Sequence, residues 1–324
     1  MFVSSRHLVS PQLRTARLGT INQHLTDAFI AGKYNSKEVF IGDGFYNGFN
    51  FYNGDDPTHG RVDYVDMGTA QSMNLTSSSA DTFITRVDTG GVDPASRGRK
   101  AVRLESKNQY ENHVLVADIR HMPEGTPTWP ALWEFGDGWP NLGELDILEG
   151  ANDNGPNLAS LHTSAGCIQP MGGRDMKGTA VSDNCDVAAN GNQGCGVKMD
   201  SPESYGPAFN GAGGGWVAVE RSNDYIKVWF WGRNDGAVPG EVRDNVQGVN
   251  PDTWGQPTAL FDSSQCPLND KFGPNKIVIN TSLCGDWAGN TYPGGMQACI
   301  DAVNSGGDWT GRAYWEFARI AVYV

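Results

Sequence analysis

The sequence predicts an all-β fold, an antiparallel β-sandwich, on two observations. The 324 residues include 42 glycines and 17 prolines, and 10% of them are aromatic. This composition is typical of turns and strands rather than helices. Short segments that alternate polar and apolar residues recur along the chain, separated by turn residues roughly every eight to twelve positions, which is the pattern of a sandwich.

The strands are expected within one domain, residues 34–324, which shows no internal repeat, linker or second domain. In chain order they cover residues 38–41, 48–52, 62–65, 83–87, 102–105, 113–119, 158–163, 216–221, 225–231, 276–283 and 313–324. Residues 113–119 are apolar on both faces, as an inner strand of a sandwich is. Trp229 and Trp231 share one face of their strand and are expected to serve packing.

A further strand, within residues 143–150, carries the acids Glu144, Asp146 and Glu149, and a glycine closes it on each side. A regular strand alternates its faces, so Glu144 and Asp146 would share a face with Leu148 while Glu149 pointed away. One extra residue, a β-bulge, would bring Glu149 back beside the other two acids. We therefore expect a bulged strand with three carboxylates on one face.

Three acids on one face repel one another, which raises the pKa of a crowded carboxyl. Hydrolysis of a glycosidic bond requires such a pair, a carboxylate nucleophile beside a protonated carboxylic acid. The spacing alone is equally compatible with an acidic edge strand or with a cation site on a loop. The tryptophans that flank the acids, Trp129, Trp133 and Trp139, point to sugar, because the C–H faces of a pyranose stack on indole.

The block from Thr128 to Gly150 resembles the catalytic strand of glycoside hydrolase family 16, in particular the fungal endo-1,3(4)-β-glucanase, or laminarinase, branch. The longer E-x-D-x-x-E form of the motif is typical of that branch. The resemblance covers about residues 36–324, and its other matching stretches are Asp56–Val62, Arg120–Pro123, Ser204–Pro207, Ile226–Phe230 and Cys284–Gly289. It implies a curved jelly roll with the substrate cleft on its concave face. It also implies retaining, endo-acting hydrolysis of β-1,3(4)-glucan by double displacement.

The resemblance assigns a role to each acid. Glu144 matches the nucleophile that attacks the anomeric carbon. Glu149 matches the acid/base, which protonates the leaving oxygen and later activates water. Asp146, between them, matches the residue that hydrogen-bonds to the nucleophile and tunes it.

Four further residues, Trp133, Trp139, His162 and Trp287, match positions at the cleft and are expected to bind substrate. For the tryptophans the alternative is packing, since a sandwich buries tryptophan in any case, but Trp287 lies in a polar loop. His162 lies on the strand after the motif, near the acid/base, although a lone histidine is more often structural. Glu134 also matches a position near the cleft, with a weak case for catalysis.

No cofactor or metal is expected. The chain lacks a P-loop lysine, a G-x-S-x-G motif and an H-E-x-x-H motif. Residues 152–155, Asn-Asp-Asn-Gly, hint at calcium, but the D-x-D-x-D-G spacing is missing and a plain turn is expected. The net charge of −13 argues against nucleic acid or an anionic membrane as partner. No apolar run approaches the roughly 18 residues of a membrane span, so a soluble protein is expected. The resemblance implies β-glucan as the partner, and a monomer is expected.

Two other functions stay open. A transglycosylase of the same fold passes the glycosyl-enzyme to another sugar instead of water, and the motif residues do not separate it from a hydrolase. A carbohydrate-binding, lectin-like protein on the same sandwich typically lacks a catalytic glutamate, whereas Glu144 and Glu149 are both present here.

The six cysteines, at positions 167, 185, 195, 266, 284 and 299, predict disulfides, because their number is even and none forms a C-x-x-C pair. The alternative is six free thiols in a cytosolic protein, and six cysteines allow fifteen pairings. Our hypothesis is that Cys284–Cys299 closes a short loop around Trp287 and that the other four form two more bridges. Three of the six lie in residues 164–209, a long segment expected to form a stapled wall beside the cleft.

Residues 1–33 lie outside the resemblance. They carry three arginines and no acid before Asp27, and they lack the apolar core of a signal peptide. We expect a disordered leader: a transit peptide is one origin, and we favour a misassigned start or exon that replaces the true signal. The disulfides and the sequons at Asn74 and Asn280 indicate an extracellular protein, although the second sequon lies in an expected core strand.

Overall fold

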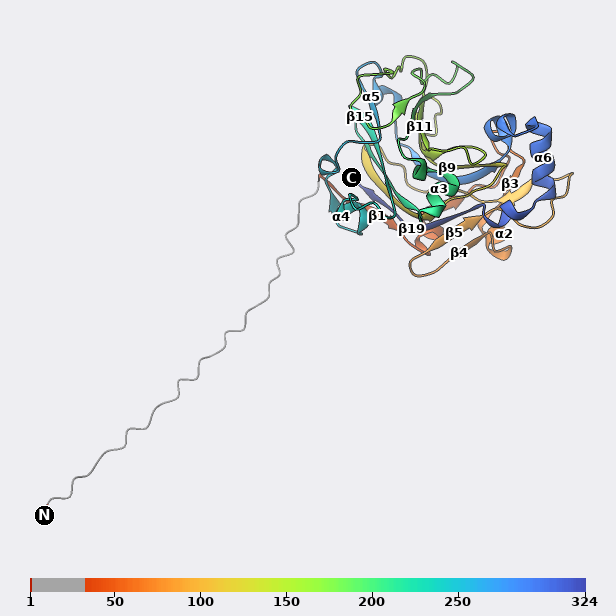
Figure 1. Cartoon of the computed structure of the whole chain (residues 1–324), viewed down its shortest axis with the longest axis horizontal. Coiled ribbons are helices and arrows are strands. Elements are labelled where there is room, and N and C mark those ends of the chain that lie inside the picture. The colour runs from red at the N-terminus through yellow and green to blue at the C-terminus, as the bar shows by residue number, and fades with distance from the viewer. Residues whose placement is uncertain (2–32) are drawn as a thin grey trace. The chain divides into compact units, whose positions relative to one another are not determined.

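The computed structural model describes Met1 and residues 33–324 (Figure 1). The expected leader, residues 1–33, therefore lies outside the described residues except for its two end positions. Lys33 contacts the domain, because its Nζ donates a hydrogen bond to Glu220 Oε1 at 2.8 Å, and the side chain of Glu220 is fully buried.

Two antiparallel sheets make up the domain, as a sandwich requires. The first has nine strands; its main order is β16 (Gly248–Val249), β1 (Tyr34–Phe40), β19 (Tyr314–Tyr323), β8 (His113–His121), β14 (Gly215–Arg221), β15 (Tyr225–Gly232) and β17 (Ala259–Asp262), and β5 (Phe83–Arg86) joins β19 to β4 (Thr76–Ser78). The second has eight strands, in the order β12 (Thr179–Ala180), β13 (Cys195–Lys198), β11 (Leu158–His162), β10 (Glu144–Glu149), β9 (Thr128–Phe135), β18 (Lys276–Leu283), β7 (Arg103–Ser106) and β2 (Phe49–Phe51). A separate parallel pair consists of β3 (Val62–Tyr64) and β6 (Arg99–Ala101).

The main core lies between the two sheets. Leu145 and Leu161 of the eight-stranded sheet belong to the same buried cluster as Leu115 and Val217 of the nine-stranded sheet. Strand β8 lies between β19 and β14 and is buried over most of its length, which confirms the inner strand predicted at residues 113–119. The sheets and their curvature are visible in Figure 1, and they confirm the predicted curved antiparallel sandwich.

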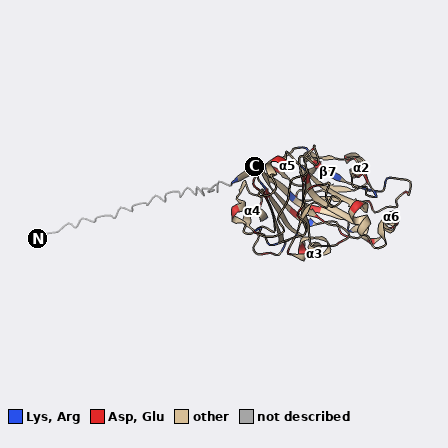
Figure 2. Ribbon diagram, turned by 90° about the horizontal axis from the view of Figure 1, so that it is seen from above, with Lys and Arg blue, Asp and Glu red and all other residues tan. Residues whose placement is uncertain are grey.

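A second apolar cluster covers the outer face of the nine-stranded sheet. It contains Trp229 and Trp231 together with Trp254 and Tyr323, so the prediction that the first two tryptophans serve packing is confirmed. Charged residues of both signs are interspersed over the domain (Figure 2).

The helices are short and lie in the connections. Their bounds are α1 (Gly44–Gly48), α2 (Met67–Ser72), α3 (Gly206–Gly211), α4 (Gly240–Arg243), α5 (Leu268–Lys271) and α6 (Gly295–Ser305), with one-turn segments η1 (Pro202–Ser204), η2 (Pro251–Thr253), η3 (Gly285–Gly289) and η4 (Asp308–Gly311). Helix α6 was not expected from the composition; it buries Cys299 and Val303, one turn apart, in a small cluster with Leu283. Within the described part of the chain, none of the helices combines the length and the apolar character needed to cross a membrane.

The six cysteines form three disulfides, Cys167–Cys266, Cys185–Cys195 and Cys284–Cys299. The hypothesis that Cys284–Cys299 is one bridge and that the other four cysteines form two more is therefore confirmed. Two of the bridges anchor the segment 164–209, which contains β12, β13 and η1 and ends within α3.

Candidate active site

The acid strand contains the predicted bulge. Strand β10 pairs with β9 so that Asp146 lies opposite Trp133 and Leu148 opposite Leu132, which leaves Ile147 as an extra residue. Ile147 and Leu148 both point into the core between the sheets. Regular alternation would have placed Leu148 on the acid face; the bulge places Glu149 there instead, beside Glu144 and Asp146.

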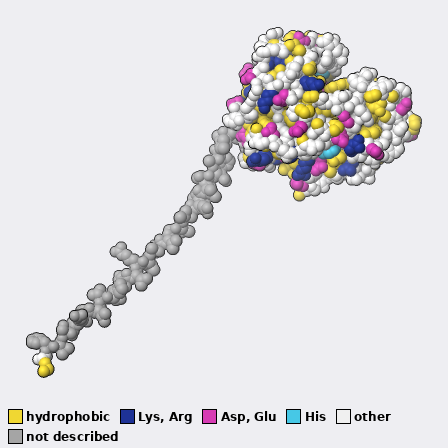
Figure 3. Space-filling model, viewed as in Figure 1, with side chains coloured by type: hydrophobic (Ala, Val, Ile, Leu, Met, Phe, Trp, Pro, Cys, Tyr) yellow, Lys and Arg dark blue, Asp and Glu magenta, His cyan; other side chains and the backbone are white. Residues whose placement is uncertain are grey.

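The three acids line a cleft of about 820 Å³ on the concave face of the eight-stranded sheet. Figure 3 shows the surface of the domain hollowed on one side. The seven residues predicted for catalysis or substrate binding all line this cleft: Trp133, Trp139, Glu144, Asp146, Glu149, His162 and Trp287. Residues from β9, β10, β11 and β18 form its floor, because alternate residues of these strands face away from the core.

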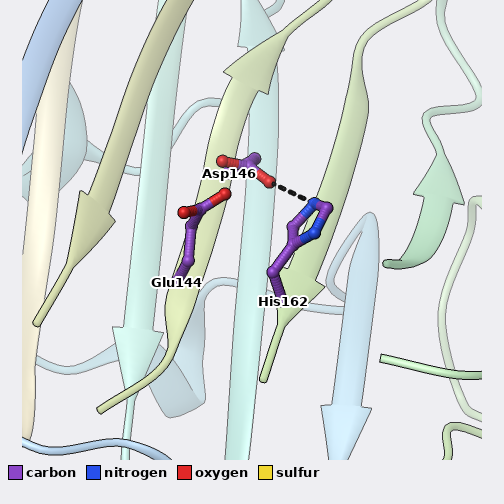
Figure 4. Close-up of side chains that lie close together, drawn as sticks. All are labelled: Glu144, Asp146 and His162. Carbon is purple, nitrogen blue, oxygen red and sulfur yellow. Dashed lines mark ion pairs between the residues drawn. The ribbon is translucent and has the colours of Figure 1, made fainter. Parts of the chain in front are cut away.

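Asp146 and His162 form an ion pair on the cleft floor (Figure 4). The Nε2 atom of His162 lies 3.2 Å from Oδ2 of Asp146, and the other ring nitrogen, Nδ1, lies 3.0 Å from Oδ1 of Asn192. Burial alone would lower the pKa of His162, but the hydrogen bond to Asp146 and the charges of Glu144 and Asp146 outweigh it and raise this pKa to about 10. His162 is therefore a cation at neutral pH.

The two outer acids are crowded and poorly solvated. Burial and the charge of Asp146 raise the pKa of Glu144 to about 7, against the opposing effects of the His162 charge and a hydrogen bond from Trp139. Burial and the same Asp146 charge also raise the pKa of Glu149 well above its ordinary value. The indole Nε1 of Trp129 donates a hydrogen bond to Glu149 Oε1 at 2.7 Å and fixes that carboxyl. The arrangement suits one ionised and one protonated carboxyl.

Glu144, Asp146 and His162 each offer one ligand atom within 4.8 Å of the others, a spacing that a cation would accept. In this structure, however, both ring nitrogens of His162 face oxygen atoms of the protein: Nε2 lies 3.2 Å from Asp146 Oδ2 and Nδ1 lies 3.0 Å from Asn192 Oδ1. The arrangement shown is therefore an ion pair between His162 and Asp146 with Glu144 beside it.

The tryptophans form the walls of the cleft. The Nε1 atom of Trp133 donates a hydrogen bond to Asn280 Oδ1 at 2.8 Å, and the guanidinium of Arg103 lies 5.1 Å from the centre of its ring. Trp139 is 44% exposed, which leaves its ring free to contact a ligand. Trp287 lies on η3 and packs edge-on against Trp129, with 5.8 Å between the centres of the two rings.

One residue near the motif lies elsewhere than expected. Glu134 does not line the cleft: it is fully buried, and its Oε1 lies 2.9 Å from Nε2 of His113 on the facing sheet. Because Trp133 faces the cleft, the next residue of β9 must face the core, so the position suggested for Glu134 was wrong.

The structure also shows the surroundings of residues 152–155 and of the two glycosylation sequons. Residues 152–155 form the predicted turn, in which the carboxylate of Asp153 accepts a hydrogen bond from the Gly125 N–H. Asn280 of the second sequon is only 7% exposed and also donates to Tyr64 Oη at 3.0 Å, which leaves no room for a glycan. Asn74 of the first sequon is exposed.

Some residues of the site were given no role in the sequence analysis. Trp129 was named there only as one of the tryptophans that flank the acids, although it lies four residues before Trp133 on β9 and therefore faces the same cleft. Asn157 accepts a hydrogen bond from the backbone N–H of Glu149, and Asn192 contacts His162 from a distant loop. These two contacts depend on chain segments that meet only in the folded state.

The family model for XgeA-like catalytic GH16 domains matches residues 49–323. An endo-1,3(4)-β-glucanase of Arthroderma benhamiae is 38% identical over 290 residues, which cover 86% of this chain and 62% of that protein. A probable glycosidase of Schizosaccharomyces pombe is 36% identical over 301 residues, 91% of this chain and 70% of that protein. The chain spans 45% of a probable endo-1,3(4)-β-glucanase of Aspergillus fumigatus, at 38% identity, so it corresponds to part of the length of these relatives.

Solved structures of GH16 enzymes also superimpose on this chain. Laminarinase 16A of Phanerochaete chrysosporium, a GH16 enzyme with two β-glucans bound in its donor and acceptor sites, is 46% identical and superimposes with a TM-score of 0.87, covering 90% of this chain and 99% of that one. An elongating GH16 β-1,3-glucosyltransferase is 34% identical, with a TM-score of 0.83 over 90% of this chain and all of that one. The bulged acid strand, the sandwich and the match over residues 49–323 lead to one conclusion: the chain belongs to glycoside hydrolase family 16.

Proposed function

We propose that this protein hydrolyses β-1,3(4)-glucan in an endo-acting reaction with retention, by double displacement. The observation that carries the proposal is the bulge at Ile147, which brings Glu149 to the same cleft face as Glu144 and Asp146. A retaining glycosidase needs two carboxyls that face each other across the scissile bond at about 5–5.5 Å, close enough that no water fits between them.

In the first step the carboxylate of Glu144 attacks the anomeric carbon, while the protonated carboxyl of Glu149 gives its proton to the glycosidic oxygen as that C–O bond breaks. The leaving sugar departs and a glycosyl ester on Glu144 remains. In the second step Glu149, now ionised, takes a proton from water, whose oxygen attacks the anomeric carbon and releases Glu144. Two inversions at one carbon give net retention.

The neighbours of these acids support their roles. The cation His162 is the strongest of the influences that hold the pKa of Glu144 down, and Asp146 keeps that cation in place through their ion pair. We assign Trp133, Trp139 and Trp287 to substrate binding, since aromatic walls on an open cleft suit a chain of neutral sugars.

The names of the relatives support the substrate class, because several are called endo-1,3(4)-β-glucanases. Transfer to a sugar is a second candidate reaction, favoured by the likeness to the elongating glucosyltransferase. Water and a sugar hydroxyl compete for the same glycosyl-enzyme, so the two activities share all residues named above.

Three disulfides support an extracellular location, since such bonds persist in oxidising compartments. We further propose that the protein is a monomer and that it carries a glycan on Asn74, the exposed asparagine of the first sequon.

The decisive experiment uses azide as a substitute nucleophile. Glu144→Ala should abolish turnover of glucan, and with azide and an activated aryl β-glycoside it should give an α-glycosyl azide. Glu149→Ala should give a β-glycosyl azide and keep part of its activity on the activated substrate. Glu203→Ala, at an exposed glutamate outside the cleft, is the control and should behave as the wild type.

Two further measurements complete the test. Proton NMR of the first products should show the β-anomer; an α-anomer first would mean inversion and would overturn both role assignments. Product sizing on laminarin and lichenan reports the linkage preference, and products longer than the substrate would favour transfer over hydrolysis.

A further inference from the structure

The bulge takes part of β10 out of its ladder with β11. Pairing between these strands runs from Glu144 opposite His162 to Asp146 opposite Ser160 and stops there. Beyond that point the side chain of Asn157 takes over: its Nδ2 donates to the Ile147 carbonyl and its Oδ1 accepts from the Glu149 N–H, both at 2.8 Å. One carboxamide thus supplies the donor and acceptor that a neighbouring peptide group would have given.

Asn157 is itself held in place by hydrogen bonds of its backbone to neighbouring residues. It is only 1% exposed. Its backbone N–H donates to Ser204 Oγ at 3.0 Å, and its backbone carbonyl accepts from the Met199 N–H at 2.9 Å. Ser204 Oγ in turn donates to the Ser201 carbonyl at 2.6 Å. Both polar groups of the side chain and both of the backbone are therefore engaged, and the amide has no freedom to turn away from the bulge.

From this arrangement we infer that Asn157 is the positioning residue for the acid/base, acting through the backbone on either side of Leu148. The inference rests on the proposed function of Glu149. Without the amide, the Ile147 carbonyl and the Glu149 N–H are left unpaired in a dry interior. The strand relieves this by returning toward regular alternation, which turns Leu148 to the cleft and Glu149 toward the core.

The test is Asn157→Ala, assayed on laminarin and on an activated aryl β-glycoside, with and without azide. Loss of general acid–base catalysis lowers rates by roughly 100- to 10,000-fold, and a displaced rather than deleted Glu149 should give a part of that, roughly a 10- to 100-fold fall in kcat. The KM should change little, because the tryptophan walls stay in place. Azide should restore turnover of the aryl glycoside and give the β-glycosyl azide, as it does for Glu149→Ala.

The matched control is Asn210→Ala. Asn210 makes the same kind of double contact, accepting from the Met122 N–H and donating to the Met122 carbonyl, both at 2.9 Å, but it does not line the cleft. Its loss should lower the melting temperature to a similar extent, with unchanged kcat and no effect of azide.

The outcomes separate the inference from the proposed function. Wild-type kcat in Asn157→Ala, or a loss of kcat that azide does not reverse while it does reverse that of Glu149→Ala, overturns the positioning role alone. If Glu149→Ala itself gives no β-glycosyl azide, the acid/base assignment fails and the inference fails with it. Should Asn157→Ala not fold, Asn157→Asp keeps the shape and the acceptor but lacks the amide donor; at neutral pH it should show a smaller loss that azide also restores, and wild-type kcat there would overturn the role.

Discussion

His162 on β11 lies opposite Glu144 in the strand register and pairs with Asp146, its Nε2 atom 3.2 Å from Oδ2 of that aspartate. One imidazolium thus lies next to two carboxylates on the cleft floor (Figure 4). Its charge offsets the repulsion between Glu144 and Asp146 and helps Glu144 to ionise. The pH dependence of the reaction should therefore depend on this ion pair.

Replacing His162 with alanine should move the acidic limb of the kcat/KM profile to higher pH. Glu144 must be ionised to attack, and its pKa of about 7 places that limb near neutrality, so activity falls as the pH drops below it. Without the His162 cation the pKa of Glu144 rises further, by about one unit for the loss of a close opposite charge. An acidic limb that stays where it is in the wild type would remove His162 from this role.

Glu144→Gln should be inactive but more stable than the wild type above neutral pH. The folded pKa of Glu144, about 7, lies above its ordinary value of 4.5, so the folded state binds this proton more tightly than the unfolded state. Its carboxyl therefore destabilises the fold progressively as the pH rises from about 4.5 to 7, and a neutral amide avoids that penalty. The gain should be about 1–3 kcal/mol at about pH 8.

The control for this variant is its own pH dependence. At about pH 4 the carboxyl is protonated in both states, so the melting temperatures of Glu144→Gln and of the wild type should coincide. An equal gain at both pH values would point to packing rather than charge as its cause.

Trp139→Ala and Trp287→Ala should weaken turnover of long glucans while they leave the fold intact. Stacking on an aromatic ring contributes on the order of 1 kcal/mol, which corresponds to roughly a fivefold loss in kcat/KM. Trp229→Ala is the contrasting variant: Trp229 is buried on the outer face, so its loss should lower the melting temperature without a selective effect on long substrates. Unchanged kinetics in both cleft variants would reassign Trp139 and Trp287 to structure.

Removal of the Cys284–Cys299 disulfide should destabilise the domain by about 3 kcal/mol, the chain-entropy value for a loop of this length. The bridge joins the residue before η3, which carries Trp287, to α6, so the double alanine variant should also lose kcat/KM on long glucans. Urea unfolding and kinetics on long and short substrates measure the two effects. A stable variant with altered long-chain kinetics would separate the role of the bridge in the cleft from its role in the fold.

Twelve of the nineteen strands that the structure describes could be predicted from the sequence, as could the bulge and the acids that line the cleft, whereas β9, next to the acid strand, was not predicted. Period-two alternation is local, so the conflict between Leu148 and Glu149 on β10 can be detected without knowing any partner strand. The same reasoning could have placed Glu134 in the core, because it follows cleft-facing Trp133. Helix α6 was harder to predict: it is one short element in a chain rich in glycine, and its stability comes from packing on Leu283 rather than from propensity.

The groups that contact the three acids could be identified only from the folded chain. His162 meets Asp146 because of the register of β11 on β10, and Trp129 reaches Glu149 from β9. Asn157, the residue before β11, forms hydrogen bonds to the backbone of the bulge. The pairing of the other four cysteines, which the sequence left open, belongs to the same class, since 99 residues separate Cys167 from Cys266. Contacts of this kind depend on long-range strand pairing, whereas a sequence pattern reports only which face each residue presents.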